Sequence, residues 1–354
     1  MKKYFILFLF AFTLTSCGGG DRLYYDPILK YEKAGFVCTK ILPGYENTHS
    51  VSAWLSSNRV IVRYKPSGGT SGAYLYDTIS KAAESLDYFW GLPISGYQHV
   101  SNKIFGIYYD YGTILKFYEM SLETKTAVTD IVDLSTGYTN FPGTNAGGYW
   151  PAFSPSKKIV RIYDTDSYIL DFDMQFLAKV DYPPHSAGPG SIRFIVTYSN
   201  IIMTDGQGDF LLINLFDYST NHISVPSLIG FAYSIESASP KEKYLVIRKP
   251  ITYPDFRDYG LAIVDLVDKT CSDLYSMDGV NYQSSLLNEP GVTLTEPIQS
   301  PLVWDSQGFI SSDLKKIAFK VTYVPGGYDS ISGRSIDDLD GLWVIDISSL
   351  NLSE

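Results

Sequence analysis

The sequence predicts an all-β protein made of repeated four-stranded sheets, and three observations support this prediction. Tyr and Phe are abundant, with 29 and 19 residues in a chain of 354, and aromatic residues favour strands. Apolar and polar residues alternate in short runs, which is the period of a half-buried strand. The runs recur in pairs about 40 to 50 residues apart, the repeat length of a β-propeller blade. We therefore expect a single six-bladed β-propeller over residues 35–354.

Each repeat has a turn, a basic residue, a first apolar run and a second apolar run that ends near Asp. The first runs begin at Arg59, Ile104, Ile159, Ile201, Tyr244 and Ile317. The second runs begin at Ala73, Leu115, Tyr168, Phe210, Leu261 and Leu342. The equivalent turn positions are taken as Asn58, Asn102, Ser156, Asn200, Lys241 and Leu314. The interval between the last two turn positions is the longest and leaves room for another blade. A seven-bladed propeller is therefore the alternative to the expected six-bladed one. The nearest candidate for an amphipathic helix is Ser80–Phe89.

One of these repeats resembles a known family. Residues Trp150 to Val160 read WPAFSPSKKIV, which is similar to the Pro-x-Trp-Ser-Pro-Asp-Gly-Lys-x-Ile-Ala phrase of TolB-like (WD40-like) β-propeller repeats. Residues 238–247 and 311–319 are similar but looser. The Asp-Gly of the phrase is replaced in this chain by Ser156-Lys157, Lys241-Glu242 or Leu314-Lys315. The resemblance covers about residues 50–350 and implies the propeller architecture; it implies no particular function.

The two ends of the repeat region are expected to meet. The last repeat supplies an inner strand near Pro301–Ser306 or just beyond, and two further strands, but little chain remains for a fourth. Gly35–Leu42 alternates like an edge strand and belongs to no unit of its own. We expect this segment to complete the final blade, because an unpaired strand edge promotes aggregation.

The first 17 residues carry an export signal. Lys2 and Lys3 precede an uncharged, largely apolar run from Tyr4 to Leu14, the pattern of a secretory signal peptide. The run ends in Leu-Thr-Ser-Cys, which resembles the bacterial lipobox. That resemblance implies cleavage after residue 16 and a lipid on Cys17, with residues 17–34 as lipidated Cys and tether. The competing interpretation is an ordinary signal peptide or a short membrane anchor.

Charge and composition restrict the partners. The formal net charge of −10 argues against nucleic acid. We expect a monomer, attached to the membrane through the lipid on Cys17, in the cell envelope. Gly18 stands where an inner-membrane retention signal would, in some bacteria, need Asp, so the outer membrane is favoured by that resemblance. Cys38 and Cys271 would meet an oxidising compartment, but they are expected on outer strands of different units, so a disulfide is left open.

The long loops indicate where a ligand would bind. The connections at 65–72, 249–260, 323–341 and 277–300 belong to the first, fifth and last units, which are neighbours in a closed ring. Insertions on one face of a repeat protein are common binding sites. The candidate binding residues on these loops are Tyr253, Asp255, Arg257, Tyr328, Arg334, Asp337 and Asp338. Solvated, variable loops are the alternative interpretation.

Motifs for chemistry are scarce. The four His residues have no metal-ligand spacing, and no Gly-x-Ser-x-Gly nucleophile motif occurs. Asp205–Asp209 has alternating Asp and Gly but lacks the calcium-loop spacing, so a hairpin turn explains it better. We therefore predict no catalytic residue, metal or cofactor.

The expected function is non-enzymatic binding or scaffolding for a protein or glycan partner. A lyase or glycosidase with its site at the channel mouth is the alternative, and a surface adhesin is a third interpretation. A buried, charged cluster with shifted pKa values near the mouth would favour the enzyme.

Overall fold

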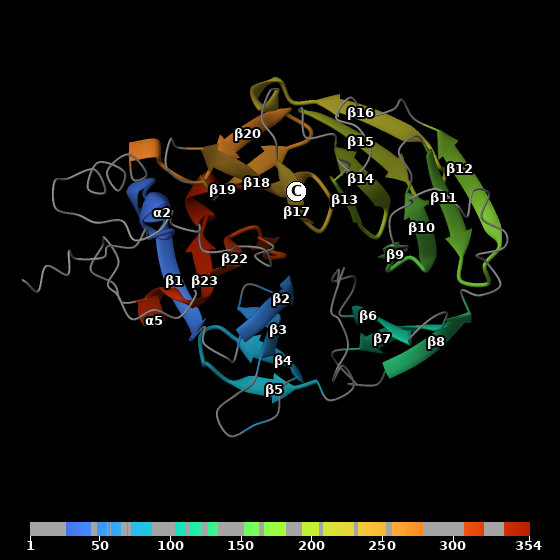
Figure 1. The fold of residues 1–354 in the computed structure, drawn as a ribbon, viewed down its shortest axis with the longest axis horizontal. Helices are drawn as coiled ribbons and strands as arrows, with labels where there is room; N and C mark the ends of the chain where they lie inside the picture. The colour runs from blue at the N-terminus through green and yellow to red at the C-terminus, as the bar shows by residue number, and fades with distance from the viewer. Residues whose placement is uncertain are drawn as a thin grey trace, which may run out of the picture.

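The computed structural model describes residues 26–43, 48–54, 56, 58–64, 69, 72–86, 103–110, 114–121, 127–133, 152–162, 166–181, 193–204, 208–229, 233–252, 257–278, 308–321 and 336–354. These residues form mostly strands, all paired antiparallel, with two short α-helices and two 3₁₀ turns (Figure 1). The predicted signal peptide and Cys17 lie outside the described residues. No helix in the described ranges is long and apolar enough to cross a membrane.

The described strands make six sheets, numbered in chain order, and the strands of each are named from the inner strand outward. Sheet 1 contains β2 (Thr48–Trp54), β3 (Arg59–Tyr64), β4 (Gly72–Asp77) and β5 (Ala83–Ser85). Sheet 2 contains β6 (Lys103–Asp110), β7 (Ile114–Ser121) and β8 (Ala127–Asp133). Sheet 3 contains β9 (Ala152–Ser154), β10 (Lys158–Ile162), β11 (Asp166–Asp171) and β12 (Phe176–Asp181).

The remaining sheets have four strands each. Sheet 4 contains β13 (Arg193–Val196), β14 (Asn200–Thr204), β15 (Asp209–Asn214) and β16 (Thr220–Ser224). Sheet 5 contains β17 (Ser234–Ala238), β18 (Tyr244–Thr252), β19 (Arg257–Asp265) and β20 (Thr270–Asp273). Sheet 6 contains β21 (Phe309–Ile310), β22 (Lys316–Val321), β23 (Gly341–Asp346) and β1 (Val37–Pro43). Each apolar run of the predicted repeats overlaps one of these strands.

The sheets follow one another around the middle of the molecule (Figure 1). Their inner strands touch in chain order: β9 contacts β13, β13 contacts β17, and β17 contacts β21. The inner strand β21 also contacts β2, so the last sheet lies beside the first. Buried aliphatic and aromatic side chains pack sheet 3 on sheet 4, sheet 4 on sheet 5, sheet 5 on sheet 6 and sheet 6 on sheet 1, as between blades of a β-propeller.

Sheet 6 is built from both ends of the described chain. β1 pairs antiparallel with β23, from Val37 opposite Asp346 to Pro43 opposite Gly341, with an irregularity between Lys40 and Leu42. The pairing predicted for Gly35–Leu42 with the final repeat is thus present. Because β1 covers the outer edge of β23, that edge is not open to another chain.

One turn geometry recurs before the second strand of three sheets. The residues with left-handed backbone are Lys157 (φ 57°), Glu242 (φ 63°) and Leu314 (φ 59°), and their N–H groups donate to the carbonyls of Ser154, Ser239 and Ser311. Glycine adopts this conformation without steric cost, which is why the family phrase has Gly there. The last of the equivalent turn positions is wrong by one residue: Asp313 is equivalent to Ser156 and Lys241, and Leu314 occupies the glycine position.

The turn after the third strand also repeats, which explains why each second apolar run ends near Asp. In each case a side-chain oxygen accepts two main-chain N–H groups of the turn, and a left-handed residue follows. The accepting residues are Asp77, Asp171, Asn214 and Asp265. The left-handed residues are Lys81, Met174, Tyr218 and Lys269. An Asx turn of this kind fixes the hairpin locally.

The folded part begins earlier than the predicted tether boundary at residue 34. Asp26 is fully buried, and its carboxylate accepts the N–H groups of Ile28 and Leu29 at 2.8 and 3.2 Å, ahead of helix α2 (Leu29–Lys33). Gly35, with φ 92°, ends the helix. Ser80–Phe89, the nearest candidate for an amphipathic helix, contains strand β5 (Ala83–Ser85), which is paired with β4. Helix α5 (Ile336–Leu339) and the 3₁₀ turns η3 (Pro226–Leu228) and η4 (Ser348–Leu350) complete the described elements.

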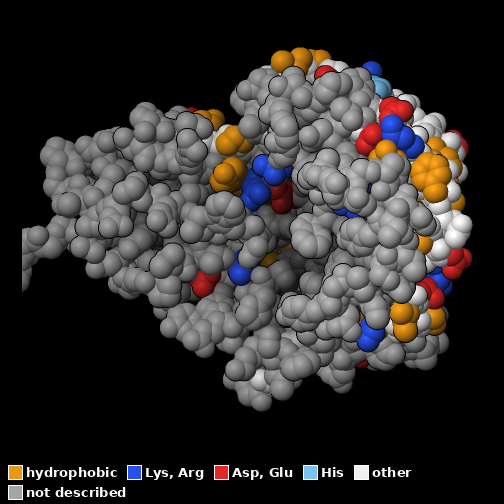
Figure 2. Space-filling view, turned by 45° about the vertical axis from the view of Figure 1, so that its right-hand side comes forward, with side chains coloured by type: hydrophobic (Ala, Val, Ile, Leu, Met, Phe, Trp, Pro, Cys, Tyr) orange, Lys and Arg blue, Asp and Glu red, His pale blue; other side chains and the backbone are white. Residues whose placement is uncertain are grey.

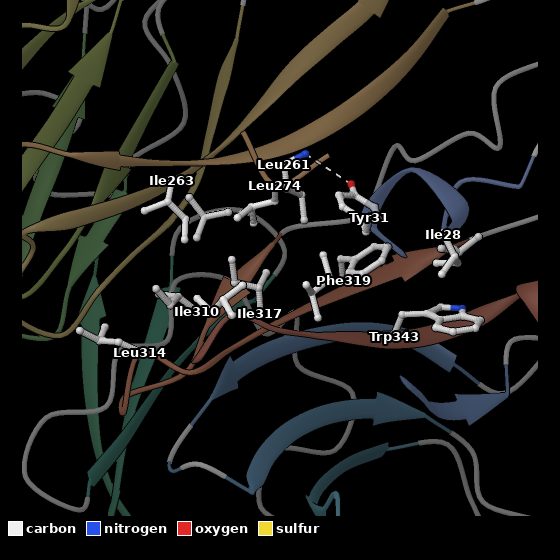
Figure 3. Packing of buried hydrophobic residues seen from close by; sticks show 14 of the residues in the cluster. Ile28, Tyr31, Leu261, Ile263, Leu274, Ile310, Leu314, Ile317, Phe319 and Trp343 are labelled. Atoms are coloured by element: carbon white, nitrogen blue, oxygen red, sulfur yellow. Dashed lines mark hydrogen bonds between the residues drawn. The ribbon is translucent and has the colours of Figure 1, made fainter. Parts of the chain in front are cut away.

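The N-terminal helix packs into the core between sheets 5 and 6 (Figure 3). Ile28 and Tyr31 lie among Leu261 and Ile263 of sheet 5 and Phe319 and Trp343 of sheet 6. The Tyr31 ring centroid is 5.4 Å from that of Phe319, and its hydroxyl accepts the N–H of Leu261 at 3.3 Å. Burying an aliphatic or aromatic side chain of this size contributes about 1.5–3 kcal/mol, so α2 helps to hold the two sheets together.

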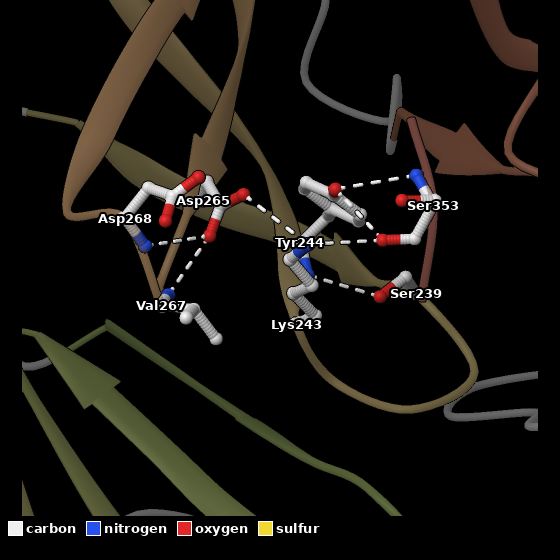
Figure 4. A network of polar contacts seen from close by, with 7 residues as sticks. All are labelled: Ser239, Lys243, Tyr244, Asp265, Val267, Asp268 and Ser353. Carbon is white, nitrogen blue, oxygen red and sulfur yellow. Dashed lines mark hydrogen bonds and ion pairs between the residues drawn. The ribbon is translucent and has the colours of Figure 1, made fainter. Parts of the chain in front are cut away.

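The C-terminal residues join the same two sheets (Figure 4). The carbonyl of Ser353 accepts the Tyr244 hydroxyl at 2.9 Å and the Lys243 ammonium at 3.0 Å. The side chain of Glu354 accepts the N–H of Lys241 at 2.9 Å. These hydrogen bonds connect the segment after β23 to the turn between β17 and β18 of sheet 5.

The two described cysteines are not bonded to each other. Cys38 is on β1 and Cys271 is on β20, the outer strands of sheets 6 and 5, and neither is part of a disulfide. Burial raises the pKa of the Cys271 thiol to about 11, so it is protonated at neutral pH. Placement on outer strands of different units agrees with the expectation from the repeats.

Candidate functional site

A buried carboxylate lies on the inner strand of sheet 5. Glu236 is 8% exposed. The pairing of β17 with β18 shifts between Ile235 and Ser237, so Glu236 is the extra residue of a β-bulge. Bulges redirect a side chain and are common next to functional sites. This one leaves Glu236 on the same side as Ser234, two residues before it.

The carboxylate is held by groups from two strands. The Glu236 Oε1 atom lies 3.0 Å from Arg248 Nε and accepts the Ser234 hydroxyl at 2.6 Å. Arg248 Nε also donates to Ser234 Oγ at 3.3 Å. Ser234 and Arg248 are directly opposite each other across β17 and β18. The result is a three-residue arrangement in which one basic, one acidic and one hydroxyl group share contacts.

Two further residues complete what we call the inner cluster: Arg193, Ser234, Glu236, Arg248 and Tyr259. The guanidinium carbon of Arg248 is 5.0 Å from the Tyr259 ring centroid, a cation–π contact. Arg193 begins β13, the neighbouring inner strand, and acts electrostatically on Glu236. Burial raises the pKa of Glu236, and the positive charges of Arg248 and Arg193 and the Ser234 hydroxyl oppose that effect. A buried carboxyl with a raised pKa beside cations is typical of functional sites.

The inner cluster lies on the face predicted for ligand binding. In an antiparallel four-stranded meander the inner strand begins, the second strand ends and the third strand begins on one and the same face. Arg193 and Ser234 begin inner strands, and Tyr259 is near the start of a third strand. Figure 2 shows basic and acidic side chains lying together in a hollow in the middle of the molecule.

The N-terminal helix supports the cluster from behind. The Lys30 ammonium is buried and donates to the carbonyl of Tyr259 at 2.6 Å, while lying 5.1 Å from the Tyr31 ring centroid. Next to Tyr259, Gly260 packs directly under the ring of Tyr275, where a Cβ atom would collide with it. Lys30 and Tyr275 therefore both restrict the strand that carries Tyr259, whose ring lies against Arg248.

Most of the binding residues predicted on the long loops lie outside the described side chains. Tyr253, Asp255, Tyr328 and Arg334 are outside the described residues. Arg257 begins β19, with its backbone opposite Thr252, and Asp337 lies in α5. Asp338 is exposed, and its carbonyl accepts the Lys40 ammonium at 3.1 Å. Helix α2 thus contacts the strand that carries Arg257, and β1 contacts the helix that carries Asp338.

Sequence reasoning missed most of the inner cluster. Glu236 stands between Ile235 and Ala238 in a short inner strand, and Arg248 follows the apolar run Tyr244–Ile247. A charge inside a strand pattern is a signal in itself, because charged residues are seldom buried without a partner. The pairing of these two residues depends on the bulge, which the sequence pattern does not show.

The described residues offer no ready metal site. Among them, no group of three His, Cys, Asp or Glu side chains is close enough to hold a metal ion. The strands that flank the Asp-Gly segment, β14 and β15, pair antiparallel, as expected for a hairpin, and Gly208 has φ 103°. Lys249, the neighbour of Arg248, pairs with Asp273 of β20 at 2.8 Å.

Comparison with known proteins gives distant structural similarities only. No protein-family model matches the chain, and no curated protein matches it either. TolB from Acinetobacter baumannii is 14% identical with a TM-score of 0.43; the similarity covers 82% of this chain but 64% of that one. An oligogalacturonate lyase from Vibrio parahaemolyticus is 10% identical with a TM-score of 0.46, covering 92% and 96%. An oligogalacturonate lyase in complex with manganese is 11% identical with a TM-score of 0.46, covering 91% and 95%.

Proposed function

We propose that the chain is a single six-bladed propeller closed by its N-terminal strand. Three features support this proposal. The described strands make six sheets, the inner strand of the last sheet contacts that of the first, and β1 forms the outer strand of the last sheet. A closed ring places the inner cluster at the mouth of a central channel.

We further propose that the protein is exported and anchored by a lipid on Cys17 in the cell envelope, at the outer membrane. The basic start, the apolar run and the Leu-Thr-Ser-Cys ending support this proposal. Mass spectrometry of the N-terminal peptide should show an acylated cysteine, and Cys17→Ser should move the protein from the membrane to the soluble fraction. A wild-type peptide that begins at Met1 or carries no acyl group would contradict the proposal.

At this location we propose a non-enzymatic binding propeller whose ligand, a protein or a glycan, binds at the channel mouth. The observation that carries the proposal is the Glu236–Arg248 pair at a bulge of an inner strand. Arginine stacked on an aromatic ring is a common anchor in binding sites. We propose that Tyr253, Asp255, Arg257, Tyr328, Arg334, Asp337 and Asp338 form the outer part of the same site.

The test compares ligand capture by substituted proteins. The wild-type protein is screened against envelope extracts and a glycan array, and each ligand found is tested with Arg248→Gln and with Arg257→Ala. Both substitutions should weaken binding, Arg248→Gln by about tenfold or more, as for a buried arginine contact. Lys33→Met, an exposed change on α2, serves as the control. Unchanged binding by Arg248→Gln would place the ligand elsewhere.

One observation favours the alternative of a lyase or glycosidase. Glu236 is a buried carboxyl whose pKa is raised, the condition for a general acid or base near neutral pH. The same glycans should then be followed for cleavage, by new reducing ends or unsaturated products. Cleavage that is lost in Glu236→Gln, while binding is kept, would replace the binding function by the enzymatic one.

A further inference from the structure

The inner cluster already holds a carboxylate in the way that a ligand carboxylate would be held. Glu236 Oε1 receives the Arg248 guanidinium, the Ser234 hydroxyl and the electrostatic influence of Arg193. Two guanidinium groups thus act on one carboxylate: Arg248 by direct contact, and Arg193 through its charge alone. Guanidinium groups bind carboxylates through matched planar geometry.

The two members of the pair differ in their access to solvent. The side chain of Arg248 is 22% exposed and that of Glu236 is 5% exposed. Tyr259, which lies against Arg248, is 38% exposed. A molecule that arrives from solvent therefore meets Arg248 and Tyr259 first, because Glu236 is the more deeply buried residue.

We propose that Glu236 is an internal counter-ion that a carboxylate ligand replaces on Arg248, and that Glu236 takes up a proton in this exchange. The inference rests on the proposed binding site at the channel mouth. The ligand carboxylate forms the ion pair with Arg248, the Glu236–Arg248 pair breaks, and one proton from solvent binds the Glu236 carboxyl. Charge is thereby conserved in the cluster, since the ligand brings one negative charge and Glu236 loses one.

The sign of the pH dependence follows from the groups around Glu236. Those described are Ser234 on its own strand, Arg248 on β18 and Arg193 on β13, with Tyr259 of β19 behind Arg248. Burial already raises the pKa of Glu236 when Arg248 is in place. Loss of Arg248 to the ligand, and the nearby negative charge of that ligand, both raise it further. Binding therefore takes up protons and weakens as the pH rises.

The experiment uses glucuronate as the probe, with glucose as the matched neutral sugar and acetate as the bare carboxylate. Calorimetry in buffers of different ionisation enthalpy measures the protons taken up. The wild-type protein should bind glucuronate and not glucose, take up about one proton per ligand and lose affinity by up to tenfold per pH unit. Acetate binding with the same proton uptake would show that the carboxylate alone is sufficient, and its absence would show that the sugar ring is needed as well.

Glu236→Gln should bind glucuronate with no proton uptake and no pH dependence, because the amide has no charge to lose. Arg248→Gln should lose binding. Asp273→Asn is the matched control: it also removes the carboxylate partner of a basic residue on β18, in this case Lys249, and should behave as the wild type. If Glu236→Gln fails to fold, Ser234→Ala is the substitute, because it is a smaller change that removes the hydroxyl donor to Glu236. It should shift the pH dependence of glucuronate binding.

The inference is overturned if the wild type binds neither glucuronate nor acetate, if binding takes up no proton, or if Glu236→Gln keeps the wild-type pH dependence. The proposed function has a separate test. It is contradicted if the ligands found in the envelope or glycan screen bind the Arg248→Gln protein as tightly as they bind the wild type.

Discussion

At the scale of single residues, the repeats use side chains where a glycine would be easier to accommodate. Lys81, Lys157 and Lys269 all have positive φ values, at 61°, 57° and 55°. A residue with a Cβ atom in this region costs about 1–2 kcal/mol. The chain accepts the cost at each hairpin because the neighbouring Asx turns and strand pairs determine the turn. Substitutions at these positions could therefore stabilise the folded protein without any change in the core.

We expect Lys269→Gly to stabilise the protein by about 0.5–1 kcal/mol, the relief of left-handed strain minus the entropy of the added glycine. Urea unfolding of the full chain measures the difference. Lys241→Gly, next to the left-handed Glu242 but without a positive φ of its own, should destabilise. Equal changes in the free energy of unfolding for the two glycine substitutions would show that the backbone conformation at each position does not determine the effect.

At the scale of elements, helix α2 links the N-terminal segment to the candidate site. Its buried Lys30 donates to Tyr259, the ring of Tyr259 lies against Arg248, and Arg248 holds Glu236. Asp26 at the start of the helix and Gly35 at its end are ordinary helix-boundary signals. The helix between these signals is too short to show a clear apolar period, so the pattern alone predicts a tether over residues 17–34.

We expect Lys30→Met to lower stability by about 1–3 kcal/mol, because the carbonyl of Tyr259 loses a buried donor. It should also weaken ligand binding at the inner cluster through the altered position of Tyr259. Lys33→Met, on the exposed side of the same helix, should change neither quantity. Thermal unfolding and the glucuronate titration provide the two readouts. Binding that stays at the wild-type level in a destabilised Lys30→Met protein would separate the helix from the site.

At the scale of the whole molecule, the two ends of the described part of the chain meet at sheets 5 and 6. β1 covers the edge of β23, α2 fills the core between the sheets, and the last residues bond to Lys241, Lys243 and Tyr244. Each link joins segments more than a hundred residues apart in sequence. Closing such long loops is slow and entropically costly, so these links should form late in folding.

We expect a chain that begins at Asp26 to fold as the full chain does, and a chain that begins after Pro43 to aggregate, since β23 then has an open edge. Removal of residues 351–354 alone should lower the melting temperature by a few degrees, as the loss of about 1 kcal/mol does. Size-exclusion chromatography and thermal unfolding distinguish the three truncations. A monomeric, cooperatively folded chain without β1 would contradict the role assigned to that strand.

Local sequence patterns were enough to predict the paired apolar strands of each repeat and the pairing of Gly35–Leu42 with the last repeat, because alternation and turn residues are local signals. The export signal predicted for residues 1–17 is likewise a linear motif, and it stays a prediction. The contacts between charged side chains could not be predicted in this way, because they depend on the folded arrangement. The Glu236–Arg248 pair depends on a one-residue bulge, the Lys30–Tyr259 bond joins residues 229 positions apart, and the effect of Arg193 comes from a neighbouring sheet. Local patterns determine the hairpins. The packing of one sheet on the next brings distant side chains together, and it depends on the core as a whole.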